Sequence, residues 1–423
     1  MNRLKALNTS IKVGIVGAGA MGRGLFYQCQ ISPGIECVAI ADTNVEKVIS
    51  FLQGGGINYR IVDTIEAMNR TVRQSAVAVC EDGDLIAKCD QIDVLIESSS
   101  SISEAAGFAI SALECRKHLV LMNAEIDLIF GPYLMSLAHA NGAVYTSCDG
   151  DQHGVIKHLV DDLHLWGIDV VIAGNIKGFL DRYANPTTII PEADKRNLDY
   201  KMATAYTDGT KLNIEMALLS NALGLSTDVP GMYGPRAQHV REVFRLYDLD
   251  ALWKERKPLV DYILGAEPDG GVFVVGYCDH DYQRRMLQYY KMGDGPYYLF
   301  HRPYHLCHIE AMSSIAEAFL YGHSLLEPTY GLRTNVFAYA KRDLRKGDTL
   351  DGIGGYTCYG LIENCPSEVL PSGLPIALAD DVGVKRDVGR DERILLSDVD
   401  YNAGRFDFDL YLKALRSPKS FLS

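Results

Sequence analysis

Residues 11–42 read IKVGIVGAGAMGRGLFYQCQISPGIECVAIAD, and this stretch decides the fold. The short apolar run around Val13–Val16 predicts a buried strand, and a G-x-G-x-x-G spacing follows it at once. A helical pattern over 23–31 and a second apolar run over 36–41 come next, and Asp42 ends that run. This order of strand, glycine turn, helix, strand and acid predicts a dinucleotide-binding unit. The alternative is a glycine turn in some other α/β unit.

Each part of the turn has a mechanical reason. The first glycine allows the tight turn, the second lets the backbone approach a pyrophosphate, and the third lets the helix pack close to the strand. The N–H groups at the helix N-terminus would then face the phosphate charge. The predicted cofactor-binding residues of the turn are Gly17, Gly19, Ala20, Met21 and Gly22.

Asp42 bears on the choice between the two nicotinamide dinucleotides. A carboxylate at the end of the second strand can accept hydrogen bonds from the adenosine ribose hydroxyls, and it disfavours a 2′-phosphate. It therefore favours NAD over NADP. Thr43, Asn44 and Lys47 follow it and could still receive a phosphate, so we expect NAD(P) without a choice between the two.

The whole chain has the composition of an ordinary soluble protein. Its 423 residues predict two or three domains, and its net charge of −13 argues against non-specific nucleic-acid binding. Ten cysteines are scattered with no C-x-x-C spacing, which is typical of reduced thiols. No run of 18 or more apolar residues is present, and the N-terminus lacks a signal-like apolar segment. We expect a cytoplasmic protein that acts on a small molecule, without nucleic-acid or membrane partners.

Alternating strands and helices continue to about residue 150. Strands predicted at 92–96, 118–122 and 142–146 imply a parallel, doubly wound sheet. Ligands bind beyond the carboxyl ends of such strands, which places Ser98, Ser99 and Asn123 beside the nicotinamide. The alternative is that they only cap helices. Glu125 is a further candidate, for proton transfer, whereas the segment 51–79 is expected to be helix and loop.

The rest of the chain divides into two further predicted domains. Residues 151–331 combine helices with strands such as 169–173, after which Gly174–Gly178 is expected to break the pattern. Short strands with turn signals predict a small β-rich domain over 332–423. The predicted fold is therefore α/β, with a Rossmann domain over 1–150, an α/β catalytic domain and the β-rich domain.

A dinucleotide domain predicts hydride transfer, which requires a group that gives or takes a proton. Lys211 is the first choice, because it follows a turn, begins a helix and is close in sequence to Asp208. Asp208 has the chemistry of an N-cap for that helix. The alternative for Lys211 is a solvated lysine paired with Glu215, four residues further along the same helix face.

Cationic and aromatic residues elsewhere suit an anionic substrate. Lys177 and Asn175 lie in a glycine-flanked segment, and Arg302, Tyr304 and His305 surround a proline. Lysine, arginine and tyrosine together suit a phosphate or a carboxylate. The alternatives are ordinary surface charges and, for His305, a satisfied core histidine.

Two acids are candidate ligands for a divalent metal. Asp149 and Asp151 flank Gly150, and Mg²⁺ or Mn²⁺ prefers such oxygen ligands. Capping of the helix that follows is the favoured alternative.

Five segments together resemble a known family of oxidoreductases. The chain is similar to homoserine-dehydrogenase-like oxidoreductases with a C-terminal SAF domain, which 343–350 and 388–399 resemble. That family includes enzymes similar to 1-deoxy-D-xylulose 5-phosphate reductoisomerase, which supply isoprenoid precursors. The five segments are Gly17–Gly22, Asp149–Gln152, Gly174–Gly178, Thr207–Lys211 and Arg302–His305.

The resemblance implies a homodimer, a Rossmann domain, an α/β catalytic domain and, in the reductoisomerase-like members, NADPH with a divalent metal. Lys177, Lys211, Arg302 and Tyr304 would then hold a phosphorylated substrate. The chain departs from homoserine dehydrogenases in its D-x-x-K spacing, which is one residue short, and in Asn123-Ala124, where Asn-Lys is usual. The first departure leaves the role of Asp208 open, and the second argues against homoserine as the substrate.

Three functions follow as hypotheses. The first is NAD(P)H-dependent reduction of a small polyhydroxylated, phosphorylated carbonyl compound, with reductoisomerisation of 1-deoxy-D-xylulose 5-phosphate as its most specific form. The second is a sugar, polyol or hydroxy-acid dehydrogenase of carbohydrate catabolism that needs no metal. The third is a non-catalytic protein that senses the redox state of the dinucleotide.

Overall fold

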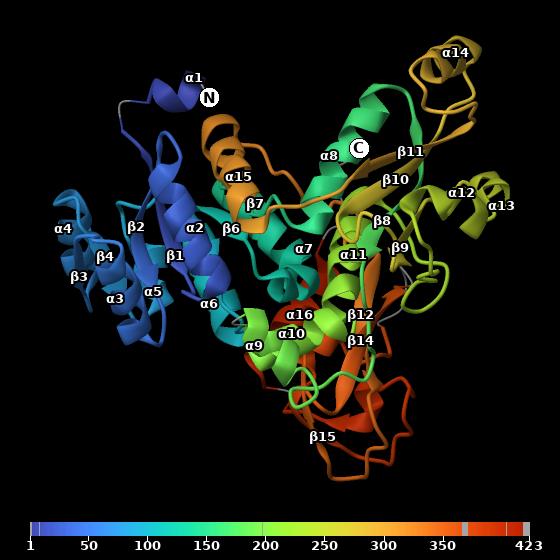
Figure 1. Ribbon diagram of the computed structural model, residues 1–423. Helices are drawn as coiled ribbons and strands as arrows, with labels where there is room; N and C mark the ends of the chain where they lie inside the picture. Colours follow the sequence, from blue (N-terminus) through green and yellow to red (C-terminus); the bar gives the residue numbers. More distant parts are fainter. Residues whose placement is uncertain (1, 8, 197, 366–370, 403, 418–423) are drawn as a thin grey trace. The chain divides into compact units, whose positions relative to one another are not determined.

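The chain folds into two compact units. The computed structural model describes residues 2–7, 9–196, 198–365, 371–402 and 404–417. Unit 1 comprises Met1–Asp151, Leu306–Glu327 and Asp409–Lys419, and unit 2 comprises Gln152–His305, Pro328–Phe408 and Ser420–Ser423. Each unit is described below by itself, with the labels of Figure 1. The division into three domains stays a prediction.

Unit 1 is built on a seven-stranded sheet in which every pairing is parallel, with the order β3-β4-β2-β1-β5-β6-β7. The central strands are apolar and buried, as parallel strands covered on both faces must be. The predicted Rossmann-type α/β fold is confirmed. The strands are β1 (Ile11–Val16), β2 (Ile35–Ala41), β3 (Tyr59–Ile61), β4 (Val77–Cys80), β5 (Val94–Glu97), β6 (His118–Leu121) and β7 (Tyr145–Ser147).

Helices connect these strands, and a helix from a distant part of the chain joins them. α15 packs against α2, and its Ala311 and Ile315 belong to the same core cluster as β1 (Figure 1). The helices of unit 1 are α1 (Asn2–Lys5), α2 (Ala20–Ile31), α3 (Val45–Gly54), α4 (Ile65–Arg73), α5 (Gly83–Lys88), α6 (Ser103–Glu114), α7 (Ala124–Asn141) and α15 (Cys307–Tyr321).

The prediction of helix and loop over 51–79 is wrong in part. The segment holds the end of α3, all of α4 and two strands, β3 and the start of β4. β3 is three residues long, and its last two residues are exposed, so it carries no apolar run that a pattern could detect. Its pairing with β4, and that of β4 with β2, is what defines these strands.

Unit 2 is built on a mixed four-stranded sheet with the order β11-β10-β8-β9. β8 (Asp169–Lys177) and β9 (Leu259–Leu264) are parallel, whereas β10 (Val272–Tyr277) is antiparallel to both β8 and β11 (Tyr297–Arg302). The expected break at Gly174–Gly178 is wrong, because β8 continues to Lys177. Gly174 sits inside the strand for a packing reason: a Cβ atom there would lie 2.2 Å from the carbonyl oxygen of Asp261.

One face of this sheet packs on α8 (Gln152–Leu165), and α11 (Thr210–Leu223) packs on α8 and β9. α11 is buried along its whole length. The other face packs on the cluster that includes Val240 and Val243. The remaining helices before residue 306 are α9 (Ile190–Arg196), α10 (Tyr200–Thr207), the 3₁₀ turn η1 (Val240–Glu242), α12 (Val243–Leu246), α13 (Leu249–Lys254) and α14 (Asp281–Tyr289).

Two small antiparallel sheets follow residue 331, as the turn-rich sequence predicted. β12 pairs with β14, and both strands pack against α11. The second sheet has the order β13-β15-β16. The elements are β12 (Thr334–Ala340), β13 (Thr349–Asp351), β14 (Cys358–Asn364), η2 (Ile376–Leu378), β15 (Asp380–Val384), η3 (Leu396–Asp398), β16 (Val399–Asp400) and α16 (Phe406–Arg416), which crosses the division between the units.

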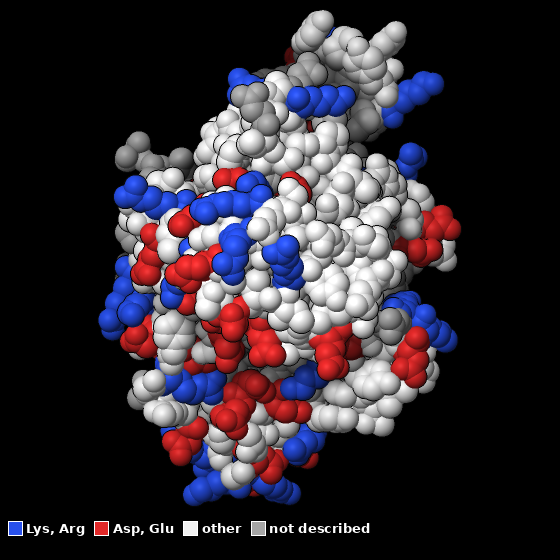
Figure 2. Space-filling model, turned by 90° about the vertical axis from the view of Figure 1, so that its left-hand side faces the viewer, with Lys and Arg blue, Asp and Glu red and all other residues white. Residues whose placement is uncertain are grey.

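Two surface properties bear on the possible partners. Among the described residues, no helix is both long and apolar enough to cross a membrane. On the face drawn in Figure 2, acidic side chains gather across the middle and lower part, and basic side chains are interspersed with them.

Candidate functional site

The glycine turn of unit 1 has the backbone geometry that the motif predicted. Gly17 has φ +93°, which glycine adopts readily and other residues rarely do. A Cβ atom on Gly22 would lie 1.8 Å from the carbonyl oxygen of Gly17, so only glycine lets α2 start this close to β1. A Cβ atom on Gly19 would meet nothing within 4 Å. The turn is therefore closed on two sides and open at its middle glycine, where a pyrophosphate would approach.

The N-terminus of α2 lies at the open position of the turn. Gly19 is its N-cap and provides no side-chain hydrogen bond to the first turn, which contains Ala20 and Met21. The N–H groups at a helix N-terminus carry partial positive charge and favour a bound anion. The turn and the helix thus fit the pyrophosphate of a dinucleotide.

Asp42 is anchored at the mouth of this turn. Its Oδ2 accepts a 2.6 Å hydrogen bond from the N–H of Ala18, and its Oδ1 accepts a 2.8 Å bond from the N–H of Asn44. The carboxylate is half-buried and fixed, and each oxygen keeps a further lone pair. Asp42 therefore fits the role of acceptor for ribose hydroxyls.

The other predicted cofactor residues hold the ends of neighbouring strands. The single hydroxyl proton of Ser98 is shared between the carbonyl oxygens of Val16 (Oγ–O 3.0 Å) and Gly17 (2.9 Å), which fixes the start of the turn. Asn123 Oδ1 accepts from the N–H of Ile126 (3.3 Å) and caps α7, and its Nδ2 donates to the carbonyl oxygen of Ser101 (2.8 Å). Both side chains therefore shape the backbone at this edge of the sheet, and any contact with the nicotinamide stays a prediction.

A buried acid at this edge was not among the predicted site residues. Glu97 ends β5 and is fully buried, and its Oε1 accepts a 2.9 Å hydrogen bond from the N–H of Ser99. Among the described residues, Oε2 has no hydrogen-bond partner. Burial raises the pKa of Glu97 to about 8, and the nearby Glu125 in the first turn of α7 adds to that rise. The sequence did contain a signal for Glu97, because an acid stands there at the end of an apolar strand.

The predicted metal ligands lie in the loop after β7. Asp149 and Asp151 are both buried. Oδ1 of Asp149 accepts a 2.7 Å hydrogen bond from the N–H of Gly150, and Oδ1 of Asp151 lies 3.8 Å from Sγ of Cys307. Two buried carboxylates are chemically suited to a hard cation, but neither the metal-binding prediction nor the capping alternative is tested by these contacts.

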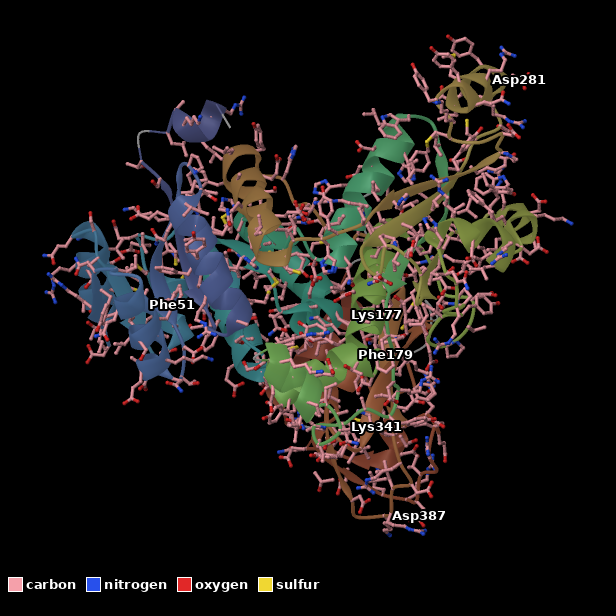
Figure 3. The ribbon with its side chains drawn as sticks, viewed as in Figure 1. Phe51, Lys177, Phe179, Asp281, Lys341 and Asp387 are labelled. Carbon is pink, nitrogen blue, oxygen red and sulfur yellow. The ribbon has the colours of Figure 1, made fainter. Side chains whose placement is uncertain are left out.

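In unit 2, three predicted substrate residues share one face of the sheet. Val272 of β10 pairs with Arg302 of β11 on one side and with Asn175 of β8 on the other. Because directly paired residues project to the same face, Arg302 and Asn175 lie on one face, about 10 Å apart across two strand spacings. Lys177 follows two residues after Asn175 on that face. It ends β8, and Figure 3 labels it.

Asn175 is unusual within this group. It is fully buried, and within the described part of the chain neither its Oδ1 nor its Nδ2 has a hydrogen-bond partner. An unpaired buried amide costs about 1–3 kcal/mol, so such a group calls for an explanation. A water molecule or a ligand is the usual one.

The end of β11 combines a cation with aromatic side chains. The guanidinium carbon of Arg302 lies 4.4 Å from the centre of the Tyr304 ring, and Tyr304 is half exposed. His305 Nε2 and Gln152 Nε2 lie 3.2 Å apart. Stacking fixes the plane of the guanidinium, and a guanidinium is a group that suits a planar or tetrahedral anion.

Lys211 is held by its neighbours at the start of α11. Thr210 Oγ1 accepts the N–H of Gly360 (2.9 Å), and Asn213 Oδ1 accepts the N–H of Ile362 (2.9 Å), so β14 fixes this end of the helix. Lys211 itself is buried.

Asp208 is not the N-cap residue of α11, so that prediction is wrong in position, although its carboxylate accepts the first N–H of the helix. Gly209, with φ +89°, occupies the N-cap, and Asp208 is the C-cap of α10. Oδ1 of Asp208 accepts a 2.8 Å bond from the N–H of Thr210, while Oδ2 lies 2.9 Å from Nζ of Lys341. Lys341, which Figure 3 labels, was not predicted, because no local pattern links positions 133 residues apart.

The comparisons with known proteins agree in part with this geometry. Residues 150–311 match the family described as the catalytic domain of the oxidoreductase DRL. The matched residues include every substrate-binding candidate, together with Asp208 and Lys211. No curated protein sequence matches the chain.

Solved structures of oxidoreductases are similar to parts of the chain. A DOX-P reductoisomerase in complex with magnesium is 13% identical, over 74% of this chain and 70% of that chain, with a TM-score of 0.40. The 1-deoxy-D-xylulose 5-phosphate reductoisomerase of Zymomonas mobilis, in complex with NADPH, is 13% identical over 50% and 57%, with a TM-score of 0.33. A probable dehydrogenase from Thermotoga maritima is 9% identical over 97% and 90%, with a TM-score of 0.36.

The matched catalytic domain and the dinucleotide-binding turn point to the same class of chemistry. The chain is an NAD(P)-dependent oxidoreductase.

Proposed function

We propose that the chain uses NAD(P)H to reduce a small polyhydroxylated, phosphorylated carbonyl compound. Its most specific form is the reductoisomerisation of 1-deoxy-D-xylulose 5-phosphate, a step in the supply of isoprenoid precursors. The observation that carries the proposal is the shared face of Asn175, Lys177 and Arg302 in unit 2.

The amide of Asn175 favours a polyhydroxylated ligand. Its buried Oδ1 and Nδ2 have no hydrogen-bond partner among the described residues. A ligand that gives Oδ1 a donor and Nδ2 an acceptor would satisfy both atoms. A sugar-like compound offers both, because each hydroxyl donates and accepts. Binding such a compound would remove the cost of the unpaired amide, about 1–3 kcal/mol.

The two cations favour a phosphate on the same compound. Arg302 stacks on Tyr304, which fixes the plane of its guanidinium. A fixed guanidinium edge can donate two parallel hydrogen bonds to phosphate oxygens. Lys177 lies on the same face and would add a second positive charge.

Lys211 is the group proposed to move the proton. It is buried and begins α11, whose start is fixed by bonds of Thr210 and Asn213 to β14. As the carbonyl carbon is reduced, the Lys211 ammonium would give a proton to the carbonyl oxygen or lower the energy of the alkoxide. A bound reduced nicotinamide supplies the hydride.

The glycine turn, Asp42 and the N-terminus of α2 would hold the dinucleotide. A requirement for Mg²⁺ or Mn²⁺ belongs to the reductoisomerase form of the proposal. Asp149 and Asp151 are its proposed ligands, because buried carboxylates suit such cations. A homodimer is part of the same proposal, and light scattering on the purified chain would test it.

The test is oxidation of NADH and NADPH against a panel of carbonyl compounds, with and without Mg²⁺ or Mn²⁺. The panel includes 1-deoxy-D-xylulose 5-phosphate, L-erythrulose and phosphorylated tetroses and pentoses. We expect turnover of the deoxyxylulose phosphate, reduced about 10²- to 10⁴-fold by Lys211→Ala. Lys195→Ala is the matched control, because that lysine is two-thirds exposed on α9.

The outcomes separate the three functions. No turnover of the deoxyxylulose phosphate with either dinucleotide and either metal would exclude the reductoisomerase form. Metal-independent turnover of another member of the panel would identify a dehydrogenase of carbohydrate catabolism. If the native chain binds a dinucleotide without turning over any compound of the panel, and Lys211→Ala leaves that binding unchanged, the redox sensor is favoured.

A further inference from the structure

A cavity lies in unit 2, away from the proposed substrate face. It has a volume of about 880 Å³, which is within the usual range of small-molecule sites. Leu259, the first residue of β9, lines it, whereas Leu264 at the other end of β9 pairs with Lys177. Five residue steps along a strand separate these two positions by about 16 Å. The cavity is therefore distinct from the face that carries Asn175 and Arg302.

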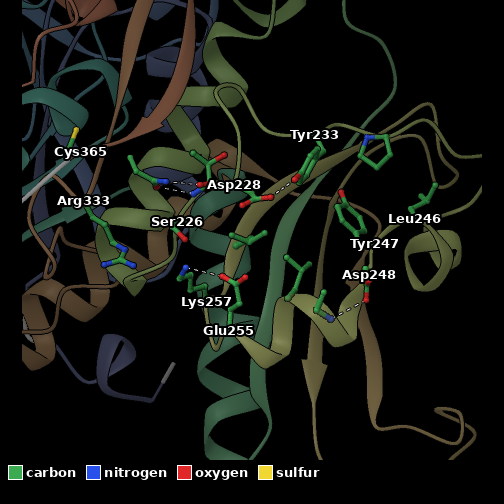
Figure 4. Close-up of a pocket in the computed structure, with 16 residues that line it drawn as sticks. Ser226, Asp228, Tyr233, Leu246, Tyr247, Asp248, Glu255, Lys257, Arg333 and Cys365 are labelled. Carbon is green, nitrogen blue, oxygen red and sulfur yellow. Dashed lines mark hydrogen bonds and ion pairs between the residues drawn. The ribbon is translucent and has the colours of Figure 1, made fainter.

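One side of the cavity gathers groups that donate hydrogen bonds to anions. Arg333, Ser226 and Lys257 lie on the same side (Figure 4). Arg333 Nε donates a 2.7 Å bond to the carbonyl oxygen of Leu225, which orients the guanidinium. Within the described part of the chain, the two terminal amino groups of Arg333 have no hydrogen-bond partner. Ser226 Oγ is 3.5 Å from its acceptor, so its hydroxyl is weakly engaged.

Three carboxylates also line the cavity, and each accepts a hydrogen bond or forms an ion pair. Asp228 accepts the hydroxyl of Tyr233, and Asp248 Oδ1 accepts a 3.0 Å bond from the N–H of Ala251 as the N-cap of α13. Glu255 forms a 2.8 Å ion pair with Lys257, but both side chains are about two-thirds exposed. Such an exposed pair is worth little, so Lys257 can turn to an incoming anion.

The opposite side is apolar and aromatic. Leu246 and Tyr247 at the end of α12 lie there (Figure 4), and Ala251 and Leu252 of α13 and Leu259 also line the cavity. Contact with these side chains would remove apolar ligand surface from water, at about 25 cal/mol per Å². The cavity thus offers one ligand a polar end, where Arg333 and Lys257 can donate hydrogen bonds, and an apolar end.

We propose that this cavity binds an amphipathic organic anion, with a carboxylate, phosphate or sulfonate head held by Arg333 and Lys257 and an apolar body against Leu246 and Leu252. The site is independent of the proposed function, because it shares no residue with the substrate face. Arg333 forms the end of the site that would bind the head group. Residues of α12 and α13 form its apolar end.

The probe is 8-anilinonaphthalene-1-sulfonate, which joins a sulfonate to an apolar aromatic body. We expect its fluorescence to rise on titration with the native chain and to saturate at one site per chain. Arg333→Gln should weaken this binding about tenfold or more, because a charge-assisted hydrogen bond is lost. Lys257→Gln should weaken probe binding several-fold. Because the Lys257 side chain is about two-thirds exposed, this variant should fold, and it tests the proposal even if Arg333→Gln does not fold.

Two controls make the result decisive. Arg256→Gln makes a comparable charge change beside Lys257, but Arg256 stacks on Trp253 and does not line this cavity, so binding should be unchanged. Arg302→Gln alters the proposed substrate face and should also leave it unchanged. The inference is overturned if Arg333→Gln and Lys257→Gln both bind the probe like the native chain, or if Arg302→Gln alone abolishes binding.

Discussion

Lys341 and Asp208 form a buried ion pair that joins the end of α10 to the residue after β12. Nζ of Lys341 lies 2.9 Å from Oδ2 of Asp208, and both side chains are almost completely buried. Nζ also donates to the carbonyl oxygens of Ala184 and Gly355, each at 2.8 Å, so all three of its protons are used. Oδ1 of Asp208 holds the first N–H of α11, and the pair therefore acts on the helix that carries Lys211.

Removing Lys341 should destabilise the chain strongly. Lys341→Met would leave the Asp208 carboxylate buried without its partner, at a cost of about 3–5 kcal/mol in the free energy of unfolding. Burial already raises the pKa of Asp208, and Lys341 opposes that rise. Urea unfolding measures the effect. The double variant Lys341→Met with Asp208→Asn should recover much of the loss, and equal losses in the single and double variants would contradict this account.

The stability of the chain should carry a pH dependence that comes from Glu97. Burial raises the pKa of Glu97 from 4.5 to about 8, so the folded state keeps a proton that the unfolded state has lost. The stability contribution is complete below pH 4.5 and is lost as the pH rises toward 8. The slope approaches about 1.4 kcal/mol per pH unit.

Glu97→Gln is the comparison for this prediction, because its neutral amide does not titrate. Relative to that variant, the native chain should lose stability between pH 5 and pH 8 in urea unfolding. Asn123, Ser99 and Glu125 surround the group and are unchanged in the variant. Parallel pH profiles for the two proteins would show that Glu97 titrates normally.

Gly19→Ala should separate dinucleotide binding from folding. A Cβ atom there meets nothing within 4 Å, so the free energy of unfolding should not fall. The methyl group would instead occupy the path of the pyrophosphate and weaken dinucleotide binding about tenfold or more. Gly107→Ala in α6, which also meets nothing within 4 Å, is the matched control for both measurements. Unchanged affinity in Gly19→Ala would place the pyrophosphate elsewhere.

Asp42→Asn should change the preference between the two dinucleotides. The substitution removes the negative charge but keeps one oxygen that can accept from Ala18 or Asn44. We expect the ratio of kcat/KM for NADPH to that for NADH to rise about tenfold, because a 2′-phosphate is no longer repelled. Titration of both dinucleotides by fluorescence checks the same ratio without a substrate. A ratio that does not move would mean that Asp42 does not face the ribose.

Asn175→Leu should stabilise the chain and impair its activity. The variant replaces an unpaired buried amide with an apolar side chain of similar size, and this should add about 1 kcal/mol to the free energy of unfolding. The same change removes the proposed partner of a substrate hydroxyl, so KM should rise at least tenfold. Thermal unfolding and steady-state kinetics on one preparation test both halves. A loss of stability would show that a buried water already satisfies the amide.

Local patterns predicted the parts of this fold that depend on neighbours in sequence. The strand, turn and helix of residues 11–42 were confirmed because the positive φ of Gly17 and the close approach of Gly22 to the carbonyl oxygen of Gly17 are local to this segment. β3 was missed because a short, partly exposed strand is defined by its pairing with β4.

The candidate site was less predictable, because its interactions are distant in sequence. The place of Asp208 just before a predicted helix was enough to select it from the sequence. Its partner Lys341 lies in a distant part of the chain, so the ion pair could not be predicted. Glu97 could be seen to end a strand, yet its raised pKa depends on complete burial. The common face of Asn175 and Arg302 follows only from the register of β8, β10 and β11.

The assembly of unit 1 from separate chain segments bears on how the protein is made. α15 places Ala311 and Ile315 in the core around β1, although some 300 residues separate them in sequence. On the ribosome, the first 151 residues emerge long before this helix does. Until residues 307–321 have been made, the part of the core around β1 that α15 covers stays exposed, and exposed apolar surface in an incompletely folded chain favours aggregation.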